Sequence, residues 1–78
     1  MNNIYFARTD NTGDLTRFFP TQGEAMDWAE DHARDEATVW CLELSQLSLA
    51  NLIEVLNDAQ GDASDLLRAA DIVWEMPQ

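Results

Sequence analysis

An almost unbroken apolar run, Thr38-Val-Trp-Cys-Leu-Glu-Leu44, lies in the middle of the sequence. Its branched and aromatic residues favour a β-strand, and its length is that of a strand rather than a helix. A strand this apolar must be covered on at least one face, so it is predicted to be the central strand of a sheet. The rest of the chain must therefore supply its strand partners and the helices that cover it.

Two strand-like segments precede this run and are joined by a strong turn signal. Residues 4–9 are rich in aromatic and branched side chains, and residues 15–19 follow after Asp10-Asn-Thr-Gly-Asp14. The pattern predicts an antiparallel hairpin. Because neighbours in a strand point to opposite faces, Phe18 and Phe19 must diverge. One of these two rings is then either covered by another element or left exposed for a partner.

A first helix is predicted after Pro20, which stops the second strand. Thr21-Gln-Gly-Glu24 has the form of a capping box, with Thr21 as the N-cap and Glu24 reaching back to it. The helix should run to about Glu36. Its narrow apolar stripe consists of Ala25, Trp28, Ala29 and Ala33.

Two further helices and a last strand are predicted after the central run. Ser48 should cap a helix over residues 49–58, and Asp62 should cap a shorter one over residues 63–70. The side chains that these helices should bury are Leu49, Leu52, Ile53, Leu56, Leu66, Leu67 and Ala70. Residues 72–76 could extend the last helix, but Val73 and Trp74 favour a strand.

The resulting element order is ββαβ(αα)β within a single domain that spans residues 1–78. This order predicts the α+β class. The expected architecture has two layers, a four-stranded, mainly antiparallel sheet with helices on one face. An unpaired first or last strand could pair with that of a second copy and form a homodimer.

The charge of the chain restricts its partners. Fifteen acidic residues face four arginines, there is no lysine, and the net charge is −11. Such a chain repels DNA, RNA and anionic lipid and attracts cationic partners, although an acidic surface also serves solubility. No apolar run approaches the ~20 residues of a membrane span. The N-terminal residues lack the pattern of a secretory signal, and a single cysteine, Cys41, fits a reducing cytoplasm.

No motif in the sequence indicates catalysis, a metal or a cofactor. His32 and Glu36 are spaced for one helix face but lack the further ligands of a zinc site. The segment Asp10–Thr16 misplaces the glycine of a calcium loop, and no glycine-rich phosphate loop is present. The chain is therefore expected not to be an enzyme, unless His32 takes part in an activity that the sequence does not reveal.

The first predicted helix carries most of the acidic residues of the N-terminal half. Asp27, Asp31 and Asp35 recur at i, i+4 and i+8, which would align their carboxylates at ~6 Å steps along one edge. Such a row is a coarse imitation of a phosphate strand and would suit a basic groove that holds nucleic acid. The expected partner-binding residues are Glu24, Asp27, Glu30, Asp31 and Asp35, with Asp62 and Asp65 from a second acidic cluster. A merely solvated helix face is the alternative.

The length of the chain, its acidic helix, its second acidic cluster and its lack of a catalytic motif together support a resemblance. Across its 78 residues the chain resembles the small acidic inhibitors that phages and mobile elements use against host defence, such as anti-CRISPR and antirestriction proteins. The resemblance implies a stoichiometric inhibitor that binds a basic nucleic-acid-handling complex and blocks its substrate groove without turnover.

Two other functions are compatible with the same sequence. An immunity protein or antitoxin would share the acidic surface but rely also on aromatic hot spots, for which Tyr5, Phe18 and Phe19 are candidates. A small regulatory module would use its acidity for solubility alone, and its binding would be insensitive to salt.

Overall fold

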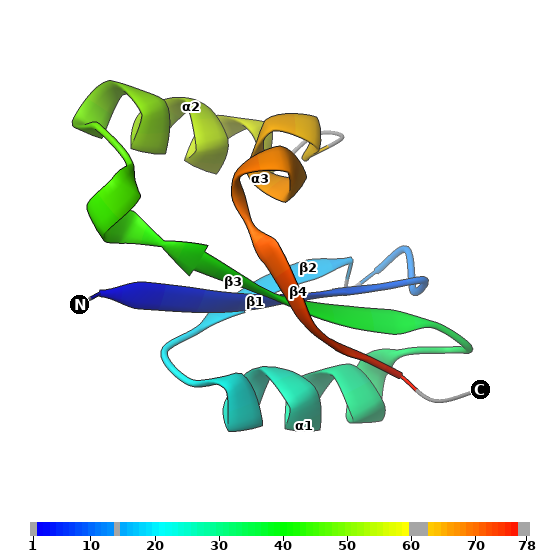
Figure 1. Ribbon diagram of the computed structural model, residues 1–78. Helices are drawn as coiled ribbons and strands as arrows, with labels where there is room; N and C mark the ends of the chain where they lie inside the picture. The colour runs from blue at the N-terminus through cyan, green and yellow to red at the C-terminus, as the bar shows by residue number, and fades with distance from the viewer. Residues whose placement is uncertain (1, 14, 60–62, 77–78) are drawn as a thin grey trace.

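The computed structural model describes residues 2–13, 15–59 and 63–76. Its four strands form one antiparallel sheet in the order β2-β1-β3-β4 (Figure 1). The strands are β1 (Asn3–Thr9), β2 (Thr16–Phe19), β3 (Ala37–Glu43) and β4 (Asp71–Glu75). The apolar run is thus a central strand, as predicted, and the hairpin of β1 and β2 is confirmed.

Among the described residues, three α-helices and one short 3-10 helix complete the fold. They are α1 (Gln22–His32), η1 (Leu44–Gln46), α2 (Leu49–Asp58) and α3 (Ser64–Ala69). The hydroxyl of Thr21 accepts a hydrogen bond from the Glu24 amide at 3.3 Å, and that of Ser48 accepts one from the Asn51 amide at 3.2 Å. These bonds confirm Thr21 and Ser48 as N-caps, but the described structure shows no return bond from the Glu24 carboxylate to the Thr21 amide, so the reciprocal half of the predicted capping box is not formed. The element order and the α+β class are also as predicted.

The placement of the helices corrects the two-layer prediction. Helix α1 covers one face of the sheet, while α2 and α3 lie over the opposite face (Figure 1). The prediction that all helices lie on one face is therefore wrong. The reason is visible in β1, where Phe6 is buried on the α2–α3 side and its neighbour Ala7 on the α1 side. Both faces of the central strands are apolar, so both require cover.

The two phenylalanines of β2 diverge as predicted. Phe19 points to the α1 side, where its ring lies 5.8 Å from that of Trp28. Phe18 points to the other side, 5.4 Å from the ring of Phe6, and is 36% exposed. Phe6 also stacks at 6.0 Å on Trp40, which lies opposite it on β3. An aromatic row therefore crosses three strands on the α2–α3 face.

The buried side of α2 differs from the predicted one. Val55 is its buried residue, whereas Leu49, Ile53 and Leu56 are 74%, 50% and 43% exposed. The sequence pattern had assigned these three leucine and isoleucine side chains to the core, and that assignment is wrong. Leu52 is half-buried. The apolar side of α2 is thus broader than the contact that it makes.

Helix α3 is shorter than predicted and begins without a side chain cap of its own. Its N-cap residue is Ala63, with a left-handed φ of 59°. Asp62, the predicted cap, lies outside the described residues. The Asp58 carboxylate instead accepts hydrogen bonds from the amides of Asp65 at 2.8 Å and Leu66 at 3.4 Å. Leu66 is fully buried, as predicted.

The C-terminal segment forms a strand, so the alternative that it extends α3 is wrong. β4 pairs with β3, with Val39 opposite Trp74 and Trp40 opposite Ile72, and a bulge interrupts the pairing between these two positions. Within the described ranges, no helix is long and apolar enough to pass through a bilayer.

Candidate acidic interaction surface

Helix α1 separates its apolar and acidic residues completely. Ala25, Trp28 and Ala29 are buried against the sheet. Four acidic residues on the outer side are all exposed, and we call them the acidic face of α1: Glu24, Asp27, Glu30 and Asp31. At ~100° per residue they occupy an arc of about 120° opposite the alanines. The prediction that these four residues lie on the outer side of the helix, opposite its apolar stripe, is therefore confirmed.

No cation neutralises the acidic face of α1 within the described part of the chain. The hydrogen bonds of Glu24 involve its backbone amide rather than its carboxylate. The ion pair found elsewhere, between Asp65 and Arg68 at 3.7 Å, belongs to α3. The four carboxylates consequently repel one another and create a negative potential outside α1.

Asp35 does not continue the acidic row as predicted, because α1 ends at His32 rather than near Glu36. Ala33 is already extended, with ψ at 147°. The chain is turned away by the first hairpin: Asn11 donates a side-chain hydrogen bond to the His32 carbonyl at 3.1 Å. Asp35 is exposed but sits in the loop beyond the helix.

The Asp10 carboxylate holds this loop in place. Its oxygens accept hydrogen bonds from the amides of Arg34 at 2.8 Å and Asp35 at 2.9 Å. Partial desolvation would raise the pKa of the Asp10 carboxyl, but the amide hydrogen bonds from Arg34, Asp35 and Glu36 outweigh it and lower that pKa. The backbone of Asp35 is thereby fixed in the loop beyond the end of α1.

The remaining predicted site residues lie elsewhere. Asp65 belongs to α3, which lies over the opposite face of the sheet from α1 (Figure 1). Asp62 lies outside the described residues. The structure therefore brings Glu24, Asp27, Glu30 and Asp31 together on α1, leaves Asp35 in the loop beyond the helix and separates Asp65 from all of them.

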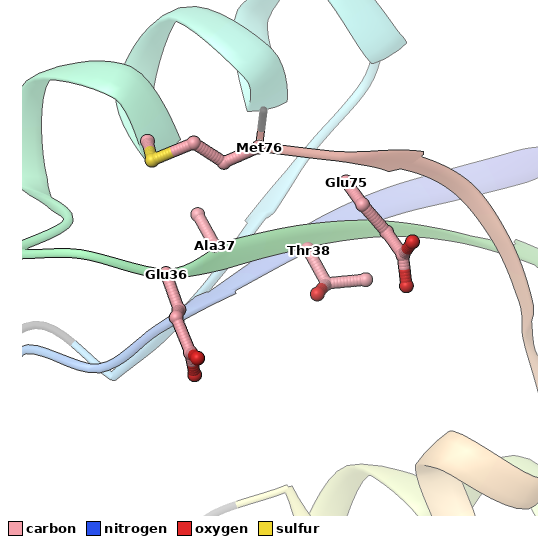
Figure 2. A pocket seen from close by; sticks show the side chains of 5 residues that line it. All are labelled: Glu36, Ala37, Thr38, Glu75 and Met76. Carbon is pink, nitrogen blue, oxygen red and sulfur yellow. The ribbon is translucent and has the colours of Figure 1, made fainter. Parts of the chain in front are cut away.

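A shallow hollow of about 340 Å³ opens at the edge of β3 and β4. Figure 2 shows Glu36, Thr38 and Glu75 pointing to the side away from α1, while Ala37 and Met76 point toward it. The two carboxylates make this hollow negative as well. Among the described residues, no group of three or more histidine, cysteine and acidic side chains could hold a metal ion.

His32 has a packing role that its sequence position did not reveal. Its ring stacks on Trp28 with centroids 4.9 Å apart, and its Nδ1 atom lies 2.9 Å from the Trp28 carbonyl oxygen. This i, i+4 contact covers one side of the indole. The ring of His32 thus completes the anchor of α1.

Comparison with known proteins adds no relative: no family model matches the chain, and neither the curated proteins nor the solved structures contain a match.

Proposed function

We propose that the protein is a non-catalytic, stoichiometric inhibitor of a basic nucleic-acid-handling protein or complex in a reducing cytoplasm. The observation that carries this proposal is the acidic face of α1, with four exposed carboxylates and no neutralising cation in the described structure. Asp27 and Asp31 lie one helical turn apart, about 6 Å, and would occupy positions that phosphates take in a basic groove.

Folding does not require this arrangement. Like charges at i and i+4 destabilise a helix by a few tenths of a kcal/mol per pair. The apolar contacts that hold α1 come from Ala25, Trp28 and Ala29 on its other side. A surface whose charge opposes folding is better explained by a cationic partner, whose approach it would accelerate.

The acidic face is also held rigidly, which favours binding. Trp28 packs between Phe19 and His32, and Asp10 fixes the loop that carries Asp35. A preorganised surface loses less conformational entropy when it binds. The protein would therefore present its carboxylates in fixed positions rather than as a flexible acidic tail.

The test replaces Asp27 and Asp31 with arginine. The tagged protein is immobilised, nuclease-treated host lysate is passed over it, and the captured partner is eluted with a salt gradient or with competing duplex DNA. We expect a basic nucleic-acid-binding protein that moderate salt and DNA release. The Asp27→Arg/Asp31→Arg variant should bind it more than about tenfold more weakly without loss of fold.

A matched control carries the same change of charge on another surface. Asp71→Arg/Glu75→Arg alters two exposed acidic residues of β4 and should retain most of the affinity. If both double variants weaken binding equally, only net charge matters and the acidic face is not the site. Unchanged affinity in the α1 variant would also refute the proposal.

A second candidate function, neutralisation of one cognate toxin, is favoured by the partial exposure of Phe18 on an edge strand. Exposed aromatic rings are common hot spots of tight protein interfaces. In that case the captured protein would resist salt, and Phe18→Ala would reduce its affinity more than the α1 charge reversal.

A further inference from the structure

A row of polar side chains crosses the sheet on the face that α2 and α3 share. Thr16, Arg8 and Thr38 lie side by side on β2, β1 and β3, each two residues from the aromatic row of these strands. Glu75 of β4 lies opposite Thr38, and we call these four residues the polar row. Because side chains alternate along a strand, the polar row shares the face of the aromatic row. Figure 2 shows Thr38 and Glu75 pointing to that side.

Arg8 is the unusual member of the polar row, because its charge is half-buried without a partner. Its Nη1 atom has almost no contact with solvent and no hydrogen-bond partner. The ion pair of the described structure joins Arg68 to Asp65 and does not involve Arg8. A buried polar atom without a partner lowers stability, and a charged one lowers it most. The chain has fifteen acidic residues that could have been placed beside this arginine, so its open position is better explained by a ligand.

Two further hydrogen-bond donors beside Arg8 are also unused. The Thr16 hydroxyl and the Trp40 indole nitrogen are both buried without a partner. Thr16 lies directly opposite Arg8 on β2, and Trp40 lies diagonally from it on β3. A guanidinium and an indole N–H can only donate, and a hydroxyl can donate as well. This part of the sheet therefore lacks an acceptor.

Two adjoining hollows give solvent access to the polar row. Arg8 and Thr38 belong to the lining of a hollow of about 180 Å³, and Thr38 and Glu75 to that of the hollow of about 340 Å³. The two hollows share Glu36, Ala37 and Thr38, so they form one continuous space at this end of the sheet. Their size is that of a site for a small molecule.

The two charges of the polar row indicate the chemistry of that molecule. Strands lie ~4.8 Å apart and side chains stand roughly perpendicular to the sheet, so Arg8 and Glu75 are separated by ~10 Å across Thr38. Two charge-assisted hydrogen bonds of ~2.8 Å leave roughly 4 Å between the charged groups of the ligand. Standard bond lengths place the ammonium and carboxylate groups of an amino acid about 3 Å apart, which is close to this spacing. A dianion such as phosphate would be repelled by the nearby carboxylates.

We propose that the polar row binds a small zwitterion, a free amino acid or a molecule with the same two charged groups. Arg8 holds the carboxylate, and the Thr38 hydroxyl donates to it from the neighbouring strand. Glu75 accepts from the ammonium group. The ligand thus supplies the acceptor that Arg8 lacks, and it lies over the opposite face of the sheet from α1.

The test titrates ¹⁵N-labelled protein with unlabelled probes and follows the side-chain N–H signals of Arg8 and Trp40 by NMR. Glycine and the other standard amino acids are each added up to about 10 mM, ten times a Kd of about 1 mM. Acetate and methylamine each carry only one of the two charged groups. We expect a saturable shift of both signals with at least one amino acid. Acetate and methylamine should bind about tenfold or more weakly than that amino acid.

The decisive variant is Glu75→Gln, which removes the acceptor for the ammonium group at an exposed position. It should weaken amino-acid binding by about tenfold or more and leave acetate binding unchanged or stronger. Arg8→Gln should abolish the binding of both. The matched control is Asp71→Asn, which removes the same charge at the other end of β4 and should retain affinity. Circular dichroism checks the fold, and if Arg8→Gln does not fold, Glu75→Gln decides.

Three results would overturn the proposal. The first is that no amino acid causes a saturable shift. The second is that Glu75→Gln and Asp71→Asn weaken binding equally, which would mean that only net charge matters. The third is that inorganic phosphate binds more tightly than any amino acid, which would assign Arg8 to a phosphate group. None of these results bears on the inhibitor proposal, whose own variant, Asp27→Arg/Asp31→Arg, leaves the polar row intact.

Discussion

Asp10 shows how one side chain sets the limits of the candidate site. Its carboxylate joins the first hairpin to the loop after α1, across 24 residues to Arg34. Together with the bond from Asn11 to the His32 carbonyl, these bonds hold the residues after His32 out of another helical turn. The position of Asp35 therefore depends on a residue that belongs to a different element.

The lowered pKa of Asp10 makes its stabilising effect dependent on pH. Because the folded pKa lies below the ordinary value, the effect is complete above the unfolded pKa of about 3.9 and is lost as pH falls through the folded pKa. Asp10→Asn keeps an acceptor oxygen but cannot titrate. We expect the variant to melt at a lower temperature than the native protein at neutral pH.

That difference in Tm should shrink as the pH is lowered through the folded pKa of Asp10, where the native carboxyl becomes protonated as well. A difference that stays constant from neutral to acidic pH would show that the charge of Asp10 does not contribute.

At the residue level, the sequence predicted local caps and missed distant ones. Thr21 and Ser48 bond amides three residues ahead, so their roles follow from neighbouring residues. Asp10 lies in a segment that reads as an ordinary turn, and no local pattern connects it with Arg34. The premature end of α1 could not be predicted, because it is fixed by a tertiary contact.

Among the elements, α3 is the one that depends most on a neighbour. It is six residues long, starts at a left-handed alanine and has no side-chain cap from its own N-cap residue. Such a short helix is not stable alone. Asp58 at the end of α2 supplies the missing acceptor, so α2 and α3 form one structural unit.

Replacement of Asp58 by alanine should therefore destabilise the domain. Loss of a helix cap costs about 1 kcal/mol, which corresponds to about 4–8 °C in Tm for a domain of this size. Asp58→Asn is the matched control, because its side-chain oxygen can still accept from the Asp65 amide. Thermal melts followed by circular dichroism would measure both. Equal losses in the two variants would mean that charge, rather than capping, explains the effect.

The burial of α2 illustrates the limit of periodicity. Its apolar residues span a broad arc, and the helical pattern showed correctly that the arc exists. The pattern does not specify which half of a broad arc meets the core. The structure buries Val55 and leaves Ile53 exposed, a choice that depends on how α3 and the sheet meet.

For the whole molecule, the sheet separates two cores. The sequence showed that Phe18 and Phe19 must point to opposite faces of the sheet. The same alternation of apolar residues in β1 and β3 also meant that helices must cover both faces of the sheet. Phe6 and Leu42 belong to one core, and Ala7 and Val39 to the other. The fold class and the element order could be predicted from local sequence signals. To predict that helices lie on both faces of the sheet, the apolar patterns of the two paired strands β1 and β3 had to be considered together.

The two cores are not equally complete. On the α2–α3 side, the described structure contains three buried polar atoms without a hydrogen-bond partner, in the side chains of Arg8, Thr16 and Trp40. Each such atom costs about 1–3 kcal/mol. The α1 side, which carries the acidic face, has none among the described residues. The candidate inhibitory surface is therefore built on the better satisfied half of the molecule.

The net charge of −11 should make the stability of the whole protein depend on salt. Self-repulsion opposes the compact state and is screened by ions. We expect Tm to rise between about 0.02 M and about 0.5 M sodium chloride. Asp27→Asn/Asp31→Asn, which removes two charges from α1, should raise Tm at low salt and reduce its dependence on salt. A Tm that falls with salt would indicate that favourable ion pairs outweigh the repulsion.

The position of the sheet between α1 and α2 has a consequence for assembly. A protein bound over the acidic face of α1 would not obstruct one bound over α2, because the two surfaces face away from each other. If the inhibitor proposal holds, the face of the sheet that carries α2 and α3 would therefore stay accessible while the target is bound.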